Sequence, residues 1–219
     1  MITRPKNNKD LEKRAAIGVI RASRFVRRYA KSNKEIDVST IRHIHKEIWK
    51  DVWLEIAGEY RIENLEISGS SLLLPHFTEV PKLMEQMDFE LAEKIKKTGN
   101  ECRGVIVDFG EINDELLECI DKVVALSAWA HHKITYIHPF REGNGRTARL
   151  IANLILERYG LVGISVKVEQ ENKNTYIQAL SQIDTVADYE PLKNLIYKGL
   201  IERYAGVAMK YYPLSKGNK

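Results

Sequence analysis

The sequence predicts an all-α protein that carries one small β-hairpin. Apolar residues recur every three or four positions over most of the chain, which is the spacing of one face of a helix. Cap-forming residues such as Asp37 and Asn113 precede these segments, and Gly99 and Gly160 follow two of them. Only the stretch Tyr60–Ile67 has the short extended runs that are typical of a hairpin.

Seven helices are expected in order along the chain. Pro139 disfavours helical geometry at the residue before it, so the fourth helix should end near Tyr136. The run Gly104–Val107 has the composition of a strand. The expected helices cover Asp10–Tyr29, Asp37 or Ser39 to Ile56, Val80–Lys97, Asn113 or Asp114 to Tyr136, Asn144 or Gly145 to Tyr159, Asn174–Ile183 and Pro191–Tyr204.

Bulk composition favours a soluble globular domain. The chain has 219 residues, of which 29% are charged and 44% hydrophobic, and this length is enough for one domain with a sizeable core. No run approaches the length of a membrane span, and the polar stretch Met1–Asp10 lacks the apolar core of a signal peptide. Cys102 and Cys119 give neither a disulfide framework nor a metal-ligand spacing. We therefore expect a cytoplasmic protein, with delivery into another cell left open.

The positive charge is concentrated at the N-terminus. Residues 1–34 contain 11 Lys and Arg against 2 Asp and Glu, whereas the whole chain has a net charge of +4. This excess indicates either a solvated helix face or a surface for nucleic acid or an acidic protein. No aromatic interleaving or DNA-reading motif accompanies it, so we favour the solvated face over nucleic-acid binding.

The loop between the fourth and fifth expected helices has the features of an anion site. Gly143, Asn144 and Gly145 permit a tight loop that leads directly into a helix N-terminus, which Asn144 or Gly145 can cap. Free backbone N–H groups and the helix dipole favour an anion there. Arg146 and Arg149 lie on one face of the first turn, where cations oppose the dipole unless an anion is bound. We expect these five residues to bind phosphate groups.

Three side chains just before this turn add the chemistry of group transfer. His138 has a free pKa near neutrality and is suited to take a proton from a hydroxyl. Glu142 is a hard oxygen ligand of the kind that Mg²⁺ takes in phosphoryl-transfer sites. Phe140 would anchor the loop to the core. Together they predict nucleotide-dependent phosphoryl or nucleotidyl transfer.

These residues carry a family resemblance. The run from His138 to Arg149, His-Pro-Phe-Arg-Glu-Gly-Asn-Gly-Arg-Thr-Ala-Arg, resembles without a gap the signature of the Fic (filamentation induced by cyclic AMP) family. The resemblance covers about residues 40–200 and implies an all-helical domain that transfers AMP from ATP to a Ser, Thr or Tyr hydroxyl of a target protein, with Mg²⁺. It implies His138 as the general base and Glu142 as the metal ligand. Transfer of another phosphate-containing group, or nucleotide binding without turnover, is the alternative.

The resemblance also implies roles outside the signature. The hairpin Tyr60–Ile67 resembles the family's flap, which holds the target by strand-like pairing. Tyr176 lies in a segment that helps close the nucleotide pocket, where it would contact adenine or fill the core. At Gly104–Val107 the resemblance favours a loop or a short piece. The expected organisation is a basic helical extension over residues 1–35, the Fic domain over 36–204 and a tail over 205–219.

Control of the activity is a further expectation. Many relatives carry an inhibitory helix with Ser or Thr, three residues, Glu, and then Gly or Asn, and its Glu pairs with the second signature arginine. Here only Ser165 has a Glu four residues on, at Glu169, and Gln170 follows it. Val166 and Val168 make this stretch look extended. We expect a separate antitoxin-like protein to supply the glutamate to Arg149, with other restraints or none as the alternatives.

Overall fold

The computed structural model describes residues 5, 7–67, 73–108, 110–164 and 170–211, and these form a helical protein in which no strand occurs. Eight α-helices lie in the described residues, with two short 3₁₀ turns, η1 (Leu54–Ile56) and η2 (Phe77–Glu79). The helices are α1 (Asn8–Ala30), α2 (Val38–Trp49), α3 (Val80–Thr98), α4 (Glu101–Asp108), α5 (Asp114–Ile137), α6 (Asn144–Arg158), α7 (Gln170–Val186) and α8 (Glu190–Tyr211).

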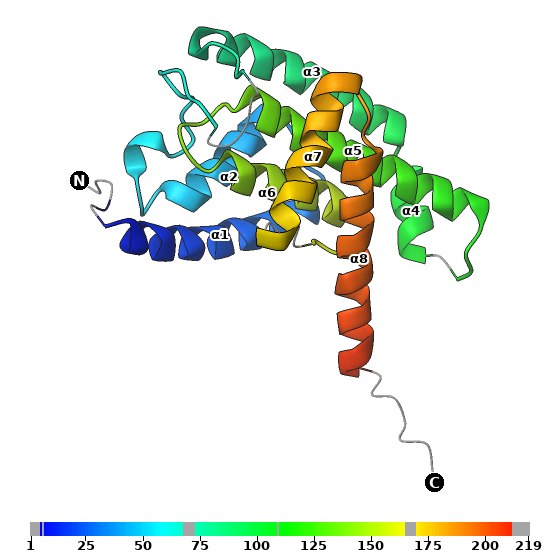
Figure 1. Cartoon of the computed structure of the whole chain (residues 1–219). Helices are drawn as coiled ribbons and strands as arrows, with labels where there is room; N and C mark the ends of the chain where they lie inside the picture. Colours follow the sequence, from blue (N-terminus) through cyan, green and yellow to red (C-terminus); the bar gives the residue numbers. More distant parts are fainter. Residues whose placement is uncertain (1–4, 6, 68–72, 109, 165–169, 212–219) are drawn as a thin grey trace.

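Helix α5 is at the centre of the arrangement (Figure 1). It packs against α6, α3, α4 and α8, while α1 packs on both α2 and α6. The loop that joins α5 to α6 therefore lies between the two helices that share the largest part of the core. The C-terminal end of α8 extends away from the rest of the molecule. No helix in the described part of the chain is long and apolar enough to cross a membrane.

The helix starts follow from the caps that the sequence predicts. Asp37 Oδ1 accepts a hydrogen bond from the Thr40 backbone N–H at 2.7 Å, and Asn113 Oδ1 accepts one from Leu116 at 2.8 Å. The second helix ends at Trp49, earlier than expected, and Ile56 reaches the core from η1 instead. The fourth expected helix continues to Ile137, one residue beyond the expected end.

The basic N-terminal helix shares the core of the molecule. Ala15, Ala22 and Val26 are buried on one face of α1. Gly18 lies on the same face, and a Cβ added there would meet the Ile48 carbonyl oxygen at 1.9 Å. The two backbones therefore approach each other so closely that only glycine fits. The exposed faces of α1 carry Arg24 and Arg28, in agreement with a solvated basic surface.

Two expectations about local structure are wrong. Gly104–Val107 belongs to helix α4, neither a strand nor a loop, because Ile106 is buried against the neighbouring helices and packing overrides the β-propensity of the run. Residues 60–67 contain no strand, so the expected hairpin is absent there. Their polar groups bond to other segments: the Arg61 N–H donates to the Pro139 carbonyl at 2.8 Å, and Asn64 Oδ1 accepts from the Phe77 N–H at 3.0 Å.

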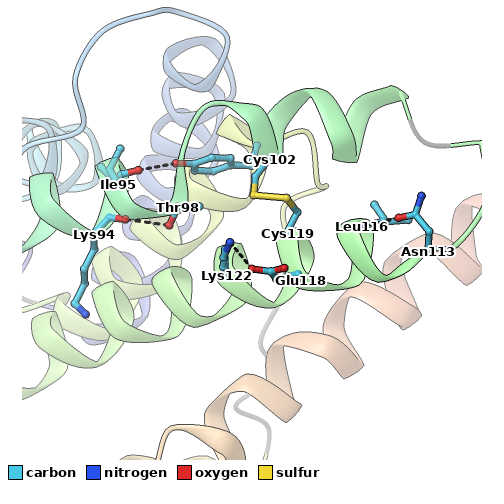
Figure 2. Close-up of a disulfide and its surroundings, with 10 residues drawn as sticks. Lys94, Ile95, Thr98, Cys102, Asn113, Leu116, Glu118, Cys119 and Lys122 are labelled. Atoms are coloured by element: carbon cyan, nitrogen blue, oxygen red, sulfur yellow. Dashed lines mark hydrogen bonds and ion pairs between the residues drawn. A yellow bond between two sulfur atoms is a disulfide. The ribbon is translucent and has the colours of Figure 1, made fainter.

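A disulfide between Cys102 and Cys119 joins α4 to α5 (Figure 2). Both cysteines are buried, and their Cα atoms lie 5.0 Å apart, within the range that a disulfide requires. The expectation that these cysteines form no disulfide is therefore wrong. Their spacing along the chain gave no signal for the pair, because α4 was not predicted as a helix that packs on α5.

Candidate active site

His138 is held with one ring nitrogen occupied and the other free for chemistry. It caps α5 in the left-handed conformation, with φ 50° and ψ 55°, and its backbone N–H donates to the Ile134 carbonyl at 3.0 Å. Nδ1 lies 3.2 Å from the Thr135 carbonyl oxygen, which can only accept, so Nδ1 carries the proton in the neutral ring. Burial lowers the pKa of His138 below its ordinary value. The ring is therefore neutral near pH 7, with Nε2 available as a base.

The loop after His138 is anchored to the core by the stacked rings of Phe140 and His45. The Phe140 side chain is fully buried and stacks on His45, with ring centroids 3.8 Å apart and planes 4° from parallel. His45 Nδ1 accepts the Gly58 N–H at 2.9 Å, so Nε2 carries the proton and donates to the Glu142 carbonyl at 2.9 Å. Burial lowers the pKa of His45 to about 4, which keeps the ring neutral and this pair of bonds intact.

Asn144 closes the loop from the inside and is not the helix cap that the sequence suggests. Its Oδ1 accepts the Phe140 N–H at 2.9 Å, and its Nδ2 donates to the Phe140 carbonyl at 2.7 Å. Gly143 is the cap residue, with φ 81°. A Cβ on Gly143 would lie 2.5 Å from Trp49 Nε1, so both its conformation and its close approach require glycine.

The first turn of α6 presents unpaired donors. The turn contains no acidic residue, and the N–H groups at its start lack carbonyl partners within the helix. Among the described residues, Arg146 Nη1 and Trp49 Nε1 are buried without a hydrogen-bond partner, and the Arg146 guanidinium lies 5.4 Å from the Trp49 ring centroid. A Cβ on Gly145 would lie 3.5 Å from Arg149 Nη1. An anion bound at this turn would satisfy these donors.

Glu142 places a carboxylate beside the same turn. The side chain is exposed, and its Oε1 accepts a hydrogen bond from the Gly143 N–H at 2.9 Å. In the described part of the chain no three acidic, His or Cys side chains come together as a metal site. The arrangement fits Mg²⁺, which is commonly bound by one or two carboxylates together with substrate phosphates and water.

Tyr176 lies in the core next to the arginines. Its side chain is 8% exposed, and its hydroxyl lies 2.7 Å from Nε2 of the buried His131. Burial raises the pKa of Tyr176 to about 12 and lowers that of His131 to about 3, so both are neutral. The contact of Tyr176 with adenine stays a prediction. The partner residue His131 lies on the buried face of α5.

Two more features of the site were not expected from the sequence. Arg61, which is 3% exposed, donates from Nε to the His138 carbonyl at 2.8 Å. A cavity of about 340 Å³ runs along α6 between α1 and α8. Arg146 and Arg149 line this cavity, with Arg27 and Arg203. Neither feature has a local sequence signal, because each depends on segments that are far apart in the chain.

The chain belongs to the Fic/DOC family, whose model matches residues 35–156. It is 29% identical over 204 residues to a protein adenylyltransferase, fic-1, from Caenorhabditis elegans, and 27% identical over 212 residues to that of Caenorhabditis briggsae. These alignments cover 91% and 94% of this chain but only 35% and 36% of the relatives. The chain therefore spans about a third of the length of these relatives.

Solved structures have the same fold. Fic-1 (residues 134–508) from C. elegans matches with a TM-score of 0.68 and 23% identity, over 96% of this chain and 55% of that one. A Fic domain protein from Bacteroides thetaiotaomicron matches with a TM-score of 0.62 and 24% identity, over 91% and 70%. BepC from Bartonella tribocorum, solved with bound AMPPNP, matches with a TM-score of 0.58 and 16% identity, over 89% and 88%.

Proposed function

We propose that this chain transfers AMP from ATP to a Ser, Thr or Tyr hydroxyl of a target protein. One observation carries the proposal: the free Nε2 of the neutral His138 lies at a loop that leads into a helix N-terminus, where Nη1 of Arg146 is buried without a hydrogen-bond partner. The names of the C. elegans and C. briggsae relatives support adenylyl transfer, and the AMPPNP in BepC supports ATP as the nucleotide.

The phosphates of ATP would lie over the first turn of α6. The free N–H groups of that turn and the helix dipole stabilise negative charge. Arg146 and Arg149 add two guanidinium groups, and Gly145 leaves the space that phosphate oxygens need next to the backbone. These donors neutralise the charge that develops on the departing pyrophosphate.

Glu142 is the residue that would hold Mg²⁺, because its carboxylate is exposed at the edge of the phosphate site. The ion would neutralise charge on phosphate oxygens. Glu142 is itself oriented by the hydrogen bond from Gly143, and its backbone is fixed by His45. The carboxylate therefore keeps a defined position beside the first turn of α6.

The chemical step exchanges one bond at the α-phosphorus. A target segment would lie along residues 60–67, which adjoin His138 through Arg61. His138 Nε2 takes the proton of the target hydroxyl, and the hydroxyl oxygen attacks the α-phosphorus. The bond from the α-phosphorus to the bridging oxygen of pyrophosphate breaks, and pyrophosphate leaves. The products are the AMP-modified target and pyrophosphate.

Two alternatives predict different products. Transfer of another phosphate-containing group would use the same base, but the intact Gly143-Asn144-Gly145 loop favours AMP transfer. A nucleotide-binding module without turnover would not need a neutral histidine with a free nitrogen. Mass spectrometry of a cell lysate incubated with the chain and isotopically labelled ATP separates them. We expect the mass of AMP on one or a few proteins. A different added group, or no labelled protein, would contradict the proposal.

We further propose that an antitoxin-like protein inhibits the enzyme by placing a glutamate against Arg149. The cavity along α6 supports this, because Arg149 lines it together with Arg27 and Arg203 and would attract an acidic segment. Glu169, the internal candidate, lies outside the described residues. The chain expressed alone should modify itself with AMP. An inert wild-type chain that Glu169→Gly activates would mean that the inhibitor is internal.

A further inference from the structure

Arg61 connects the segment that precedes η2 with the catalytic histidine. The guanidinium donates from Nε to the His138 carbonyl at 2.8 Å, from Nη1 to the Glu63 carbonyl at 3.0 Å and from Nη2 to the Pro75 carbonyl at 2.5 Å. Its backbone N–H donates to the Pro139 carbonyl at 2.8 Å. One residue therefore bonds to the catalytic residue, to the residue after it, and to carbonyls near both ends of the 61–75 segment.

The burial of Arg61 has a cost that a purely structural anchor could avoid. Its side chain is almost fully buried, and burial lowers the pKa of its guanidinium. These three side-chain bonds go to carbonyl oxygens, which compensate only part of the desolvation of a charge. What the arginine provides is geometry, because its planar guanidinium can hold three carbonyl groups in fixed directions, which a lysine ammonium cannot do.

His138 has a backbone conformation that needs such support. Its φ of 50° places a non-glycine residue in the left-handed region, which is a strained conformation for an L side chain. Strained conformations of this kind persist where the surroundings over-determine them. The carbonyl of His138 is held by Arg61 and its N–H by Ile134, so the peptide groups on both sides of the residue are fixed.

We infer that Arg61 is a positioning residue that couples residues 61–63 and Pro75 to His138, so that the imidazole faces the place where the target hydroxyl is presented. The inference rests on the proposed function. In that reaction a target along residues 60–67 and the base that deprotonates it share one anchor. Arg61 touches neither nucleotide nor target in this role, and it acts through His138.

Arg42 provides a matched control. It is also an arginine at the base of this segment, where its Nε donates to the Gly58 carbonyl at 2.8 Å and its Nη2 to the Glu59 carboxylate at 2.9 Å. Its bonds therefore hold two residues that come just before Arg61, without reaching His138. Comparing Arg61→Ala with Arg42→Ala separates the loss of an anchor from the loss of the link to the base.

The experiment measures kcat for AMP transfer and the Kd for Mg-ATP in Arg61→Ala, Arg61→Lys and Arg42→Ala. We expect Arg61→Ala to lower kcat about 100-fold, since a displacement of about 1 Å of a catalytic group has an effect of this size. We expect Arg61→Lys to lower kcat by about tenfold or more, because a lysine keeps the positive charge but cannot hold the three carbonyl groups as the planar guanidinium does. The Kd for Mg-ATP should stay within about twofold, because Arg61 lies outside the phosphate site.

Two kinetic results for Arg61→Ala would overturn the inference: a kcat no lower than that of Arg42→Ala, or a parallel loss of kcat and Mg-ATP affinity. If Arg61→Ala does not fold by circular dichroism, Arg61→Lys decides, and full activity in that variant would contradict a forked anchor. Nitrogen NMR of the His138 ring gives a readout without turnover. Its signals should shift in the Arg61 variants and not in Arg42→Ala, and unchanged signals in all three would refute the coupling. Absence of AMP transfer by the wild type would instead refute the proposed function.

Discussion

At the scale of single residues, the tautomer of His138 determines what the site can do. The Thr135 carbonyl holds the proton on Nδ1, and burial keeps the ring neutral near pH 7. The base is therefore Nε2. The hydrogen bond from Arg61 Nε to the His138 carbonyl fixes the backbone of this histidine. A neutral imidazole with a defined free nitrogen can accept a proton without any prior deprotonation step.

The pH dependence of catalysis follows from the direction of this pKa. His138 is active when neutral, and burial lowers its pKa below 6.5, so kcat/KM should be constant around pH 7 and fall as the pH drops through the lowered value. The midpoint of this acid limb should lie below about pH 6.5. Measuring kcat/KM between about pH 5 and pH 8 tests it, since this ratio reports the pKa of the free enzyme. A midpoint above the ordinary histidine value would show that burial does not control the base.

Arg149 should discriminate between nucleotides by their number of phosphates. It lies one helical turn beyond the start of the anion site, so it should contact the outer phosphates. We expect Arg149→Ala to weaken ATP binding about 10- to 100-fold, the usual effect of losing a hydrogen bond to a charged group, and AMP binding much less. Calorimetry with Arg27→Ala as the control checks this. Equal losses for ATP and AMP would contradict the assignment.

The chemical groups of the site could be predicted from the sequence, but the way they are held could not. His138, Glu142 and the arginines are adjacent in the chain, so their residue types and spacing already indicate phosphate chemistry. Asn144 was expected to cap the helix, but its side chain bonds to both backbone groups of Phe140. Both roles use the same side chain next to a helix start. Arg61 and His45 act across long sequence separations and have no local pattern.

At the scale of elements, local rules worked where a helix has both a cap and an apolar face. The starts of α2 and α5 coincide with predicted caps, and most helix ends differ by only a few residues. α4 and the 60–67 segment were mispredicted for the same physical reason. Each is short, and its conformation is decided by what it packs against. α4 packs against α5, and the 60–67 segment bonds to the loop between α5 and α6.

The disulfide should stabilise the junction of α4 and α5. Cys102 and Cys119 are 17 residues apart, and a cross-link that closes a loop of this size contributes about 3 kcal/mol. We expect Cys119→Ser to lower the free energy of unfolding by about that amount in urea. Reduced wild type should show the same loss, and the variant should be insensitive to reductant. Equal stability of oxidised and reduced wild type would contradict this.

At the scale of the whole molecule, the loop that joins α5 to α6 is anchored in the core. α1 contributes to this core through Ala15, Ala22 and Val26, so the basic helix supports α2 and α6 as well as carrying surface charge. Phe140 and His45 connect the loop to the same interior. The geometry of the site therefore depends on global stability.

Buried neutral histidines should make that stability depend on pH. The pKa of His45 is lowered by burial to about 4 and that of His131 to about 3, whereas an unfolded histidine titrates near 6.5. The unfolded chain binds more protons below pH 6.5, so the free energy of unfolding should fall from there down to about pH 4. For His45 the loss is on the order of 3 kcal/mol. Urea unfolding at pH 7.5 and about pH 4.5 tests this, and His45→Gln should reduce the difference. A stability that rises on acidification would refute it.

The fate of the α-phosphate shows whether His138 directs AMP from ATP onto a protein hydroxyl. The wild-type chain and the His138→Ala variant are each incubated with a lysate and with Mg-ATP that is labelled either on the α- or on the γ-phosphate. Protein-bound label is expected only from α-labelled ATP and only with wild type, while both proteins should bind Mg-ATP with similar affinity. Label transferred from the γ-phosphate, or equal α-labelling by the folded His138→Ala variant, would contradict it.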